Sequence, residues 1–319
     1  MPSRRVTYMG YGACALAGCL WGTGFYFGRL ALNEMSVEYM VLYRFLFASL
    51  GVLPIALTQR VRLTRSEVGI LLTSTAFGIP VQFLLQFHGL ALTTVSHASL
   101  MVGSMPVLLA VAAAMFAGER LDWLGWAALT GSTIGVALIV LGGSRGPAAR
   151  GEPTLAGDLL VVASLVTALA WILLNKKLML THSPTVVTSY SILSGTLMLA
   201  AITLGPWMLN PLLGRFMSQT LEPPPVVGVS HTAWIALAIS GLLCTATTTQ
   251  LWNWGIHHVP ASRAGVFLNI EPALGSLLGV RLLGEHLGPF AWLGGGMILT
   301  AAVILTTRGN QAEPEIILE

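Results

Sequence analysis

The chain has 319 residues, of which 55% are hydrophobic and only 9% are charged. Water-soluble domains carry roughly 25% charged residues, so the composition excludes an ordinary soluble protein and predicts an all-α polytopic membrane protein surrounded by a lipid bilayer. The net charge of +3 is small and scattered, which excludes a nucleic-acid partner. The three cysteines lie in apolar runs without the spacing of metal ligands, so we expect neither a metal nor a cofactor.

In chain order, the sequence contains successive apolar stretches of about 20 residues, the length that crosses the hydrocarbon of a bilayer. Residues 144–153, rich in Gly, Pro and Arg, predict a linker between a first half at 1–143 and a second half at 154–319. Residues 205–230 contain three consecutive prolines and predict a connector inserted into the second half. We predict ten transmembrane helices, at residues 8–32, 36–58, 68–92, 96–116, 123–141, 155–179, 185–204, 232–257, 262–283 and 289–306.

One stretch of the first half returns 166 positions later without gaps, which indicates internal duplication. Each half has five predicted spans, an odd number, so the second half enters the membrane upside down relative to the first. The predicted fold is therefore two inverted-topology five-helix repeats, an architecture with which many secondary transporters expose one midplane site alternately to either side. The identities that carry the duplication are Ser96, Ala98, Pro106, Gly118, Glu119, Leu121 and Trp126, which recur as Ser262, Ala264, Pro272, Gly284, Glu285, Leu287 and Trp292.

The distribution of basic residues predicts the orientation, because Lys and Arg are more frequent on the cytoplasmic side of membrane proteins. With both termini inside, ten of them lie on that side: Arg4, Arg5, Arg60, Arg62, Arg65, Arg120, Lys176, Lys177, Arg263 and Arg308. Five lie on the opposite side: Arg29, Arg145, Arg150, Arg215 and Arg281. The excess predicts that both termini are cytoplasmic.

Short motifs are spread over nearly the whole chain: Leu20-Trp21-Gly22, Arg44-Phe45, Ala98 to Pro106 with Gly118-Glu119, and Ala264 to Pro272 with Gly284-Glu285. Together they resemble the doubled EamA-type repeat of the drug/metabolite transporter superfamily. In length and pattern the chain is similar to the YddG-type aromatic amino-acid exporters of that superfamily. The resemblance implies a ten-span fold in a bacterial-type inner membrane, and export or exchange of small metabolites without ATP.

Polar and aromatic side chains inside the spans form rows at helical spacing, and such side chains usually face a cavity rather than lipid. Packing between helices is the alternative for Gln and Thr, and an interfacial belt is the alternative for Tyr. The mixture of aromatic residues with few polar anchors is typical of a pocket for neutral amino acids that are aromatic or apolar. The predicted substrate-binding residues are Trp21, Tyr43, Gln82, Gln86, His97, Met101, Trp171, Asn175, Tyr190, Thr249, Trp252, Phe267 and Glu271.

Glu271 differs from its counterpart in the first half, Met105, by a carboxylate about a third of the way through its span. Three roles are open for it: binding a substrate amino group, titrating with a transported proton, or a hydrogen bond that caps the helix. Pro106 and Pro272 interrupt helices at equivalent places and predict a pair of gating bends. Arg44, inside the second span, either faces the cavity or donates to backbone carbonyls.

Three classes of function compete on these patterns. A secondary transporter working by alternating access is favoured by the inverted duplication and the polar rows, with other metabolites or drugs as the alternative cargo. A channel is disfavoured because rings of charge are absent from the spans. An intramembrane enzyme is disfavoured because the sequence has no HExxH, no GxSxG and no nucleotide-binding loop. We predict a non-enzymatic transporter of small molecules, with protons as the candidate coupling ion.

Overall fold

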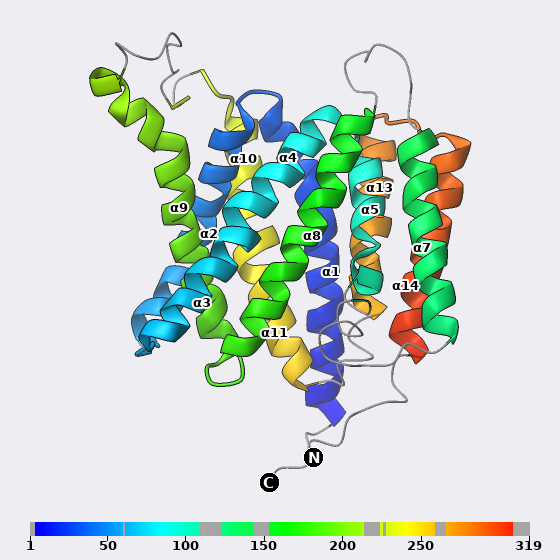
Figure 1. Cartoon of the computed structure of the whole chain (residues 1–319), viewed down its shortest axis with the longest axis horizontal. Coiled ribbons are helices and arrows are strands. Elements are labelled where there is room, and N and C mark those ends of the chain that lie inside the picture. Colours follow the sequence, from blue (N-terminus) through cyan, green and yellow to red (C-terminus); the bar gives the residue numbers. More distant parts are fainter. Residues whose placement is uncertain are drawn as a thin grey trace.

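The computed structural model describes residues 4–59, 61–108, 111, 123–142, 153–213, 224–225, 228–258 and 266–308. Most of the predicted linker, much of the predicted connector, Gly118-Glu119 and Ser262 to Ala264 lie outside the described residues. In the described part the regular elements are all helices (Figure 1). The helices of the first half are α1 (Arg4–Leu32), α2 (Val37–Thr58), α3 (Arg65–Ala76), η1 (Phe77–Val81), α4 (Gln82–Leu92), α5 (Val95–Val102) and α7 (Trp123–Gly142). Those of the second half are α8 (Leu155–Leu178), α9 (Pro184–Leu213), α10 (His231–Ala238), η2 (Ile239–Thr247), α11 (Thr248–His258), η3 (Val266–Asn269), α13 (Ile270–Leu282) and α14 (Pro289–Arg308).

The helical membrane fold is confirmed for the described residues. Six helical stretches are long and apolar enough to cross a membrane: Val37–Thr58, Arg65–Leu92, Trp123–Leu141, Leu155–Asn175, Pro184–Met208 and His231–Gly255. Two further apolar helices are shorter, Val95–Leu108 and Pro289–Ile304. The number of ten spans and their division into two inverted repeats stay predictions.

Several helices begin where a hydroxyl side chain accepts a hydrogen bond from the backbone N–H three residues later. Thr94 caps α5, Thr154 caps α8 and Ser230 caps α10 in this way. Thr64 forms a complete capping box with Glu67 at the start of α3. Because the first backbone N–H groups of a helix have no partner inside the helix, these side chains fix the starting points.

Helix α9 differs from the sequence-based expectation, because it continues to Leu213 and the predicted connector was expected to begin at 205. Gly205 and Pro206 do not end the helix, and membrane helices tolerate such residues when neighbouring groups satisfy the backbone. Trp207 and Met208 extend the apolar surface beyond them and are exposed. The connector is therefore shorter than expected.

The third and eighth predicted spans each carry a π-helical segment, η1 between α3 and α4 and η2 between α10 and α11. Pro80 lies inside η1. In η2 the hydroxyl of Thr245 donates to Ser240 O at 2.9 Å, five residues earlier. Segments of this kind are rare and often mark functional sites. They occur at corresponding places in the two halves.

The packing relates each half to the other in the same way. Helix α1 packs on α11, α13 and η2 of the second half, while α8 packs on α4, α3 and η1 of the first. Helices α2 with α9, α5 with α13, and α7 with α14 pair equivalent segments of the two halves. Figure 1 shows α1 rising from the lower side of the view, where α14 ends, and α8 descending toward that side. This arrangement is what inverted repeats predict.

Glycines let α1 approach the second half closely. The backbone O of Phe267 lies so near Gly18 that a Cβ there would overlap it, and a Cβ on Gly22 would lie 2.9 Å from Glu271 O. Small residues four positions apart are typical of close helix contacts in membranes. The middle of α1 is therefore pressed against the break between η3 and α13.

Candidate functional site

Arg44 projects from α2 into the interior of the helix bundle, where its side chain is 6% exposed. Its Nε donates to Thr245 Oγ1 at 3.1 Å. The guanidinium carbon lies 5.2 Å from the ring centre of Phe83 and 5.3 Å from that of Phe87, within cation–π range. Among the described residues no hydrogen bond involves the two terminal nitrogens, so the guanidinium keeps donors available for a ligand.

Glu271 lies in the first turn of α13 and is half-buried. Its charge interacts electrostatically with that of Arg44 on α2. Both residues border one turn of α1, since Gly22 contacts the backbone of Glu271 and a Cβ on Gly24 would lie 3.7 Å from Arg44 Nη2. Charged side chains inside a membrane protein are costly and usually functional.

Aromatic rings form a wall beside these charges. Trp21, in the same turn of α1, faces Trp252 of α11 with 5.5 Å between ring centres. Two turns earlier in α1, Cys14 is buried with Tyr11, Trp252 and Phe267 packed around it. We call Trp21, Gly22, Gly24, Arg44, Trp252 and Glu271 the central cluster.

Other predicted site residues gather around α8. Trp171 packs over Gly78 of η1, and Asn175 Oδ1 accepts a hydrogen bond from Ser74 Oγ at 2.9 Å. Gln82 lies at the start of α4 and Gln86 one turn later, where it is buried. Within the described part, Trp171 Nε1, Asn175 Nδ2 and Gln82 Oε1 are buried without a hydrogen-bond partner. Buried polar atoms are nearly always paired, so these three atoms are suited to a ligand or to water.

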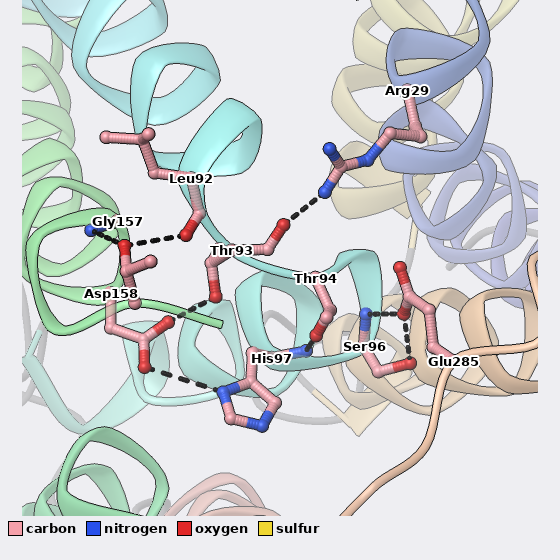
Figure 2. Close-up of polar contacts among 10 residues, drawn as sticks. Arg29, Leu92, Thr93, Thr94, Ser96, His97, Gly157, Asp158 and Glu285 are labelled. Carbon is pink, nitrogen blue, oxygen red and sulfur yellow. Dashed lines mark hydrogen bonds and ion pairs between the residues drawn. The ribbon is translucent and has the colours of Figure 1, made fainter. Parts of the chain in front are cut away.

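The remaining predicted residues make contacts elsewhere. Tyr43 packs on Trp234 at 5.0 Å, and Tyr190 packs among apolar residues of α3, α8 and α9. The hydroxyl of Thr249 donates to Thr245 O at 2.6 Å. Met101 is fully buried, and the His97 ring lies 3.4 Å from Asp158 (Figure 2). The structure places these five outside the central cluster, and their substrate-binding role stays a prediction.

The two predicted gating prolines follow breaks in their helices. Helix α5 ends at Val102, and a turn at Gly103 and Ser104 precedes Pro106. On the other side, the 3₁₀ segment η3 precedes α13, which contains Pro272 in its first turn. A Cβ on Gly103 would lie 3.2 Å from Pro272 Cβ, so the two breaks touch. A gating role stays a prediction.

Arg44 is the central residue that was not among the predicted substrate-binding residues. Its bond goes to the Thr245 side chain rather than to a backbone carbonyl. The available signal was its position, because Arg44 lies in the middle of the predicted span 36–58, whereas the other fifteen Lys and Arg residues lie outside the predicted spans or within four residues of a span end. In the described part of the chain, no group of three or more His, Cys, Asp or Glu is placed to hold a metal ion.

The model of the EamA-like transporter family matches residues 8–141 and again residues 155–307. The chain belongs to the EamA-like transporter family. The family consists of multi-pass membrane transporters, which points to a non-enzymatic role for this EamA-like protein.

Relatives of this EamA-like chain match it almost end to end. An uncharacterized transporter of Archaeoglobus fulgidus is 24% identical over 92% of this chain and 95% of its own length. The inner membrane protein YtfF of Escherichia coli is 25% identical over 94% of this chain and 95% of its own length. A probable terminal-alkyne amino-acid exporter of Streptantibioticus cattleyicolor is 24% identical over 93% of each chain. A crystal structure at 18% identity has a TM-score of 0.60, covers 96% of this chain and 99% of its own, and is similar in fold.

Proposed function

We propose that this EamA-like transporter exports or exchanges neutral amino acids with aromatic or apolar side chains, and that the central cluster binds them. The observation that carries the proposal is that Arg44 of α2 and Glu271 of α13 both lie against one turn of α1, beside the ring pair of Trp21 and Trp252. A neutral amino acid presents the matching groups: a carboxylate, an ammonium and an apolar side chain.

The guanidinium of Arg44 suits the carboxylate of such a substrate. Its fork of N–H donors matches the two oxygens of a carboxylate. Thr245 and the rings of Phe83 and Phe87 hold the guanidinium in place, so little side-chain freedom is lost on binding. The terminal nitrogens point toward α1, since Nη2 lies near Gly24.

The carboxylate of Glu271 suits the substrate ammonium. With the substrate present, the two protein charges each gain a partner of opposite sign, and the net charge of the site does not change. A cation such as lysine would add an unpaired charge to the site, and so would an anion such as glutamate. Unpaired charge away from water is costly, so the site selects against both.

Transport requires that the site open to each side in turn, and the fold supports this. The family model matches the two halves separately, and the broken helices at Gly103 and Pro272 touch beside the central cluster. We propose two inverted repeats of five spans, both termini in the cytoplasm, and rocking of the repeats about these breaks. The relative named as a probable terminal-alkyne amino-acid exporter supports amino acids as the cargo class.

The test is counterflow in proteoliposomes that contain the purified protein and unlabelled phenylalanine. Labelled phenylalanine is expected to accumulate transiently and to saturate, and external methionine is expected to compete. Stronger competition by lysine or glutamate than by methionine would contradict the neutral amino-acid site. Flux that does not saturate would indicate a channel, and a saturating flux of other metabolites without phenylalanine would indicate another cargo.

A further inference from the structure

Figure 2 shows a cluster of polar side chains at the turn between α4 and α5, none of which belongs to the central cluster. Asp158, in the first turn of α8, is completely buried, and His97 of α5 is 3% exposed. His97 Nδ1 lies 3.4 Å from Asp158 Oδ2, and Thr93 Oγ1 donates to Asp158 Oδ1. The imidazole and the carboxylate therefore face each other away from water.

This pair spans the two halves of the chain, because α5 belongs to the first and α8 to the second. The junction is held from the α8 side by Thr154, whose Oγ1 donates to Leu92 O at 2.7 Å. It is held from the α13 side by Glu285, which accepts from Val95 N at 2.7 Å and from Ser96 N at 2.8 Å. Gly284 has a φ of 67°, which forms the turn that aims Glu285 at the start of α5.

The charged groups around the pair are few. Arg29 of α1 donates to Thr93 O, and the carboxylate of Glu285 caps the first turn of α5. Helix α13 also carries Arg281, which is exposed, and α7 carries no charged residue. On α4, His88 pairs with Glu38 of α2 at an exposed position. His97 and Asp158 are therefore a buried His–carboxylate pair at the interface of the halves.

We propose that the His97–Asp158 pair is the proton-binding site that couples transport to a pH gradient. One proton occupies the contact between Nδ1 and Oδ2. A second proton, taken from water, binds Nε2 and gives an imidazolium–carboxylate pair, and its release to water restores the first state. The two states have net charges of −1 and 0 and differ by one proton.

The coupling follows from the position of the pair. Movement of the second half against the first separates α8 from α5, which exposes Asp158 and His97 and takes away each one's partner. Burial and a neighbouring charge both change how tightly a group holds its proton, so proton affinity differs between the conformations, and binding favours one of them.

The proton site and the proposed amino-acid site are linked through α5. Besides His97, α5 carries Ser96 and Ser99, which lie against Gly279 and Gly275 of α13. Glu271 belongs to the same helix α13. The substrate ammonium at Glu271 and the proton at His97–Asp158 thus occupy separate places on two helices in contact. The coupling part of this inference rests on the proposed function.

The experiment compares phenylalanine exchange with gradient-driven transport in proteoliposomes that contain the pH-sensitive dye pyranine. Exchange at equal pH needs no net proton movement, whereas uptake driven by a pH gradient does. We expect His97→Gln, which keeps a hydrogen-bond donor toward Asp158, to retain exchange and to lose both the acceleration by the gradient and the pyranine signal. Asp158→Asn is expected to act likewise. Glu38→Gln, which removes the carboxylate 3.1 Å from His88 at an exposed site, is the matched control and keeps all three readouts.

The outcomes separate this inference from the proposed function. Wild-type exchange of phenylalanine without any effect of the gradient would overturn the proton site and leave the amino-acid site intact. Loss of exchange and gradient response together, in variants that melt at the wild-type temperature, would also overturn it, since the pair would then serve transport by holding the helices. If the wild type exchanges no phenylalanine, the proposed function fails, and the proton site is then tested by measuring proton uptake by the purified protein. A His97→Gln curve of proton uptake identical to that of the wild type would overturn the proton site, and uptake of one proton fewer would support it.

Discussion

Trp21 in α1 and Trp171 in α8 occupy corresponding places in the two halves, but the charge around them differs. Trp21 faces Trp252 and lies next to the charges of Arg44 and Glu271. Trp171 lies over Gly78, beside the neutral amide of Asn175 and its bond to Ser74. Similar aromatic walls thus lie beside α1 and beside α8, and the charges of Arg44 and Glu271, one from each half, lie at the wall beside α1.

The difference continues at the corresponding positions in the sequence. At the offset that relates Tyr43 to Tyr190, the counterpart of Arg44 is Ser191, and the counterpart of Glu271 is Met105. Ser191 is completely buried, and its hydroxyl has no hydrogen-bond partner among the described residues. Duplication provides a symmetrical scaffold, while a zwitterion requires an asymmetrical lining, so divergence at these two positions is what a transporter of neutral amino acids requires.

The largest effect is expected from Arg44→Gln, which removes the positive charge beside Trp21 of α1. Glu271 then loses the favourable influence of the Arg44 charge, and a charge inside a membrane protein is costly without a neighbour of opposite sign. We expect a lower melting temperature and no phenylalanine counterflow. Adding Glu271→Gln is expected to restore the melting temperature without restoring transport. Wild-type counterflow by Arg44→Gln would remove this residue from the site.

Trp252→Ala is expected to have the next largest effect, on affinity. Burying an aromatic side chain contributes about 1.5–3 kcal/mol, so losing its contact with the substrate weakens phenylalanine binding roughly tenfold or more. The KM of counterflow measures this, and Trp252→Phe is expected to recover most of it. If Trp171→Ala raises the KM more than Trp252→Ala does, the substrate side chain lies beside Trp171 of α8 and not beside Trp252.

Gly78→Ala tests how tightly Trp171 of α8 is packed against η1. The added Cβ would overlap the Trp171 ring, and overpacking costs roughly 1–3 kcal/mol. A lower melting temperature in detergent is expected for Gly78→Ala. Gly69→Ala is the control, because a Cβ there meets nothing within 4 Å. Equal melting temperatures for the two variants would show that Trp171 moves aside freely.

The double variant Pro106→Ala with Pro272→Ala tests whether the two helix breaks in contact, one after α5 and one before α13, serve as hinges. Alanine restores the N–H that proline lacks and favours a continuous helix. We expect a severalfold lower turnover, on the order of 1 kcal/mol in the barrier, with little change in melting temperature. Unchanged turnover in a well-folded double variant would remove the gating role.

The smallest effect is expected at Glu34, which joins the α1–α2 turn to the start of α10 and forms no ion pair with another described residue. Hydrogen bonds from Ser230 N and Oγ, both at 2.6 Å, hold the pKa of Glu34 below its usual range. A lowered folded-state pKa means that the stabilisation is present above the unfolded value of about 4.3. It is lost as the pH falls through the lower folded value. Glu34→Gln is expected to flatten this acid-side loss of melting temperature slightly, and an unchanged pH profile would contradict it.

Hydropathy and helix-breaking residues predicted much of the fold, because crossing lipid restricts the chain to long apolar helices. The breaks near Pro106 and Pro272 follow from the missing N–H of proline. The π-helical segments η1 and η2 were not predicted, since a shifted hydrogen-bond register depends on what packs against the helix. The extension of α9 to Leu213 was missed because Gly205 and Pro206 end helices in water more strongly than in a membrane.

The site was harder to predict than the fold. Trp252 was predicted from helical spacing, Trp21 from its correspondence with Trp171, and Glu271 from its difference from Met105. The three residues lie around one turn of α1. Spacing within one helix cannot tell which neighbour a residue meets, so the contact of His97 with Asp158 was not predicted. Arg44 needed its partners on η2 and α4 to be known before its guanidinium could be placed.

The central claim is that Arg44 of the first half and Glu271 of the second half bind the carboxylate and the ammonium of one amino acid. Its most direct test is binding of phenylalanine, phenethylamine and 3-phenylpropionate to the purified wild type and to Glu271→Gln, measured by calorimetry. The wild type is expected to prefer phenylalanine to both analogues. Glu271→Gln is expected to lose the preference over 3-phenylpropionate, which lacks the ammonium, and to keep the preference over phenethylamine, which lacks the carboxylate. The wild-type order of affinities in Glu271→Gln would contradict the claim.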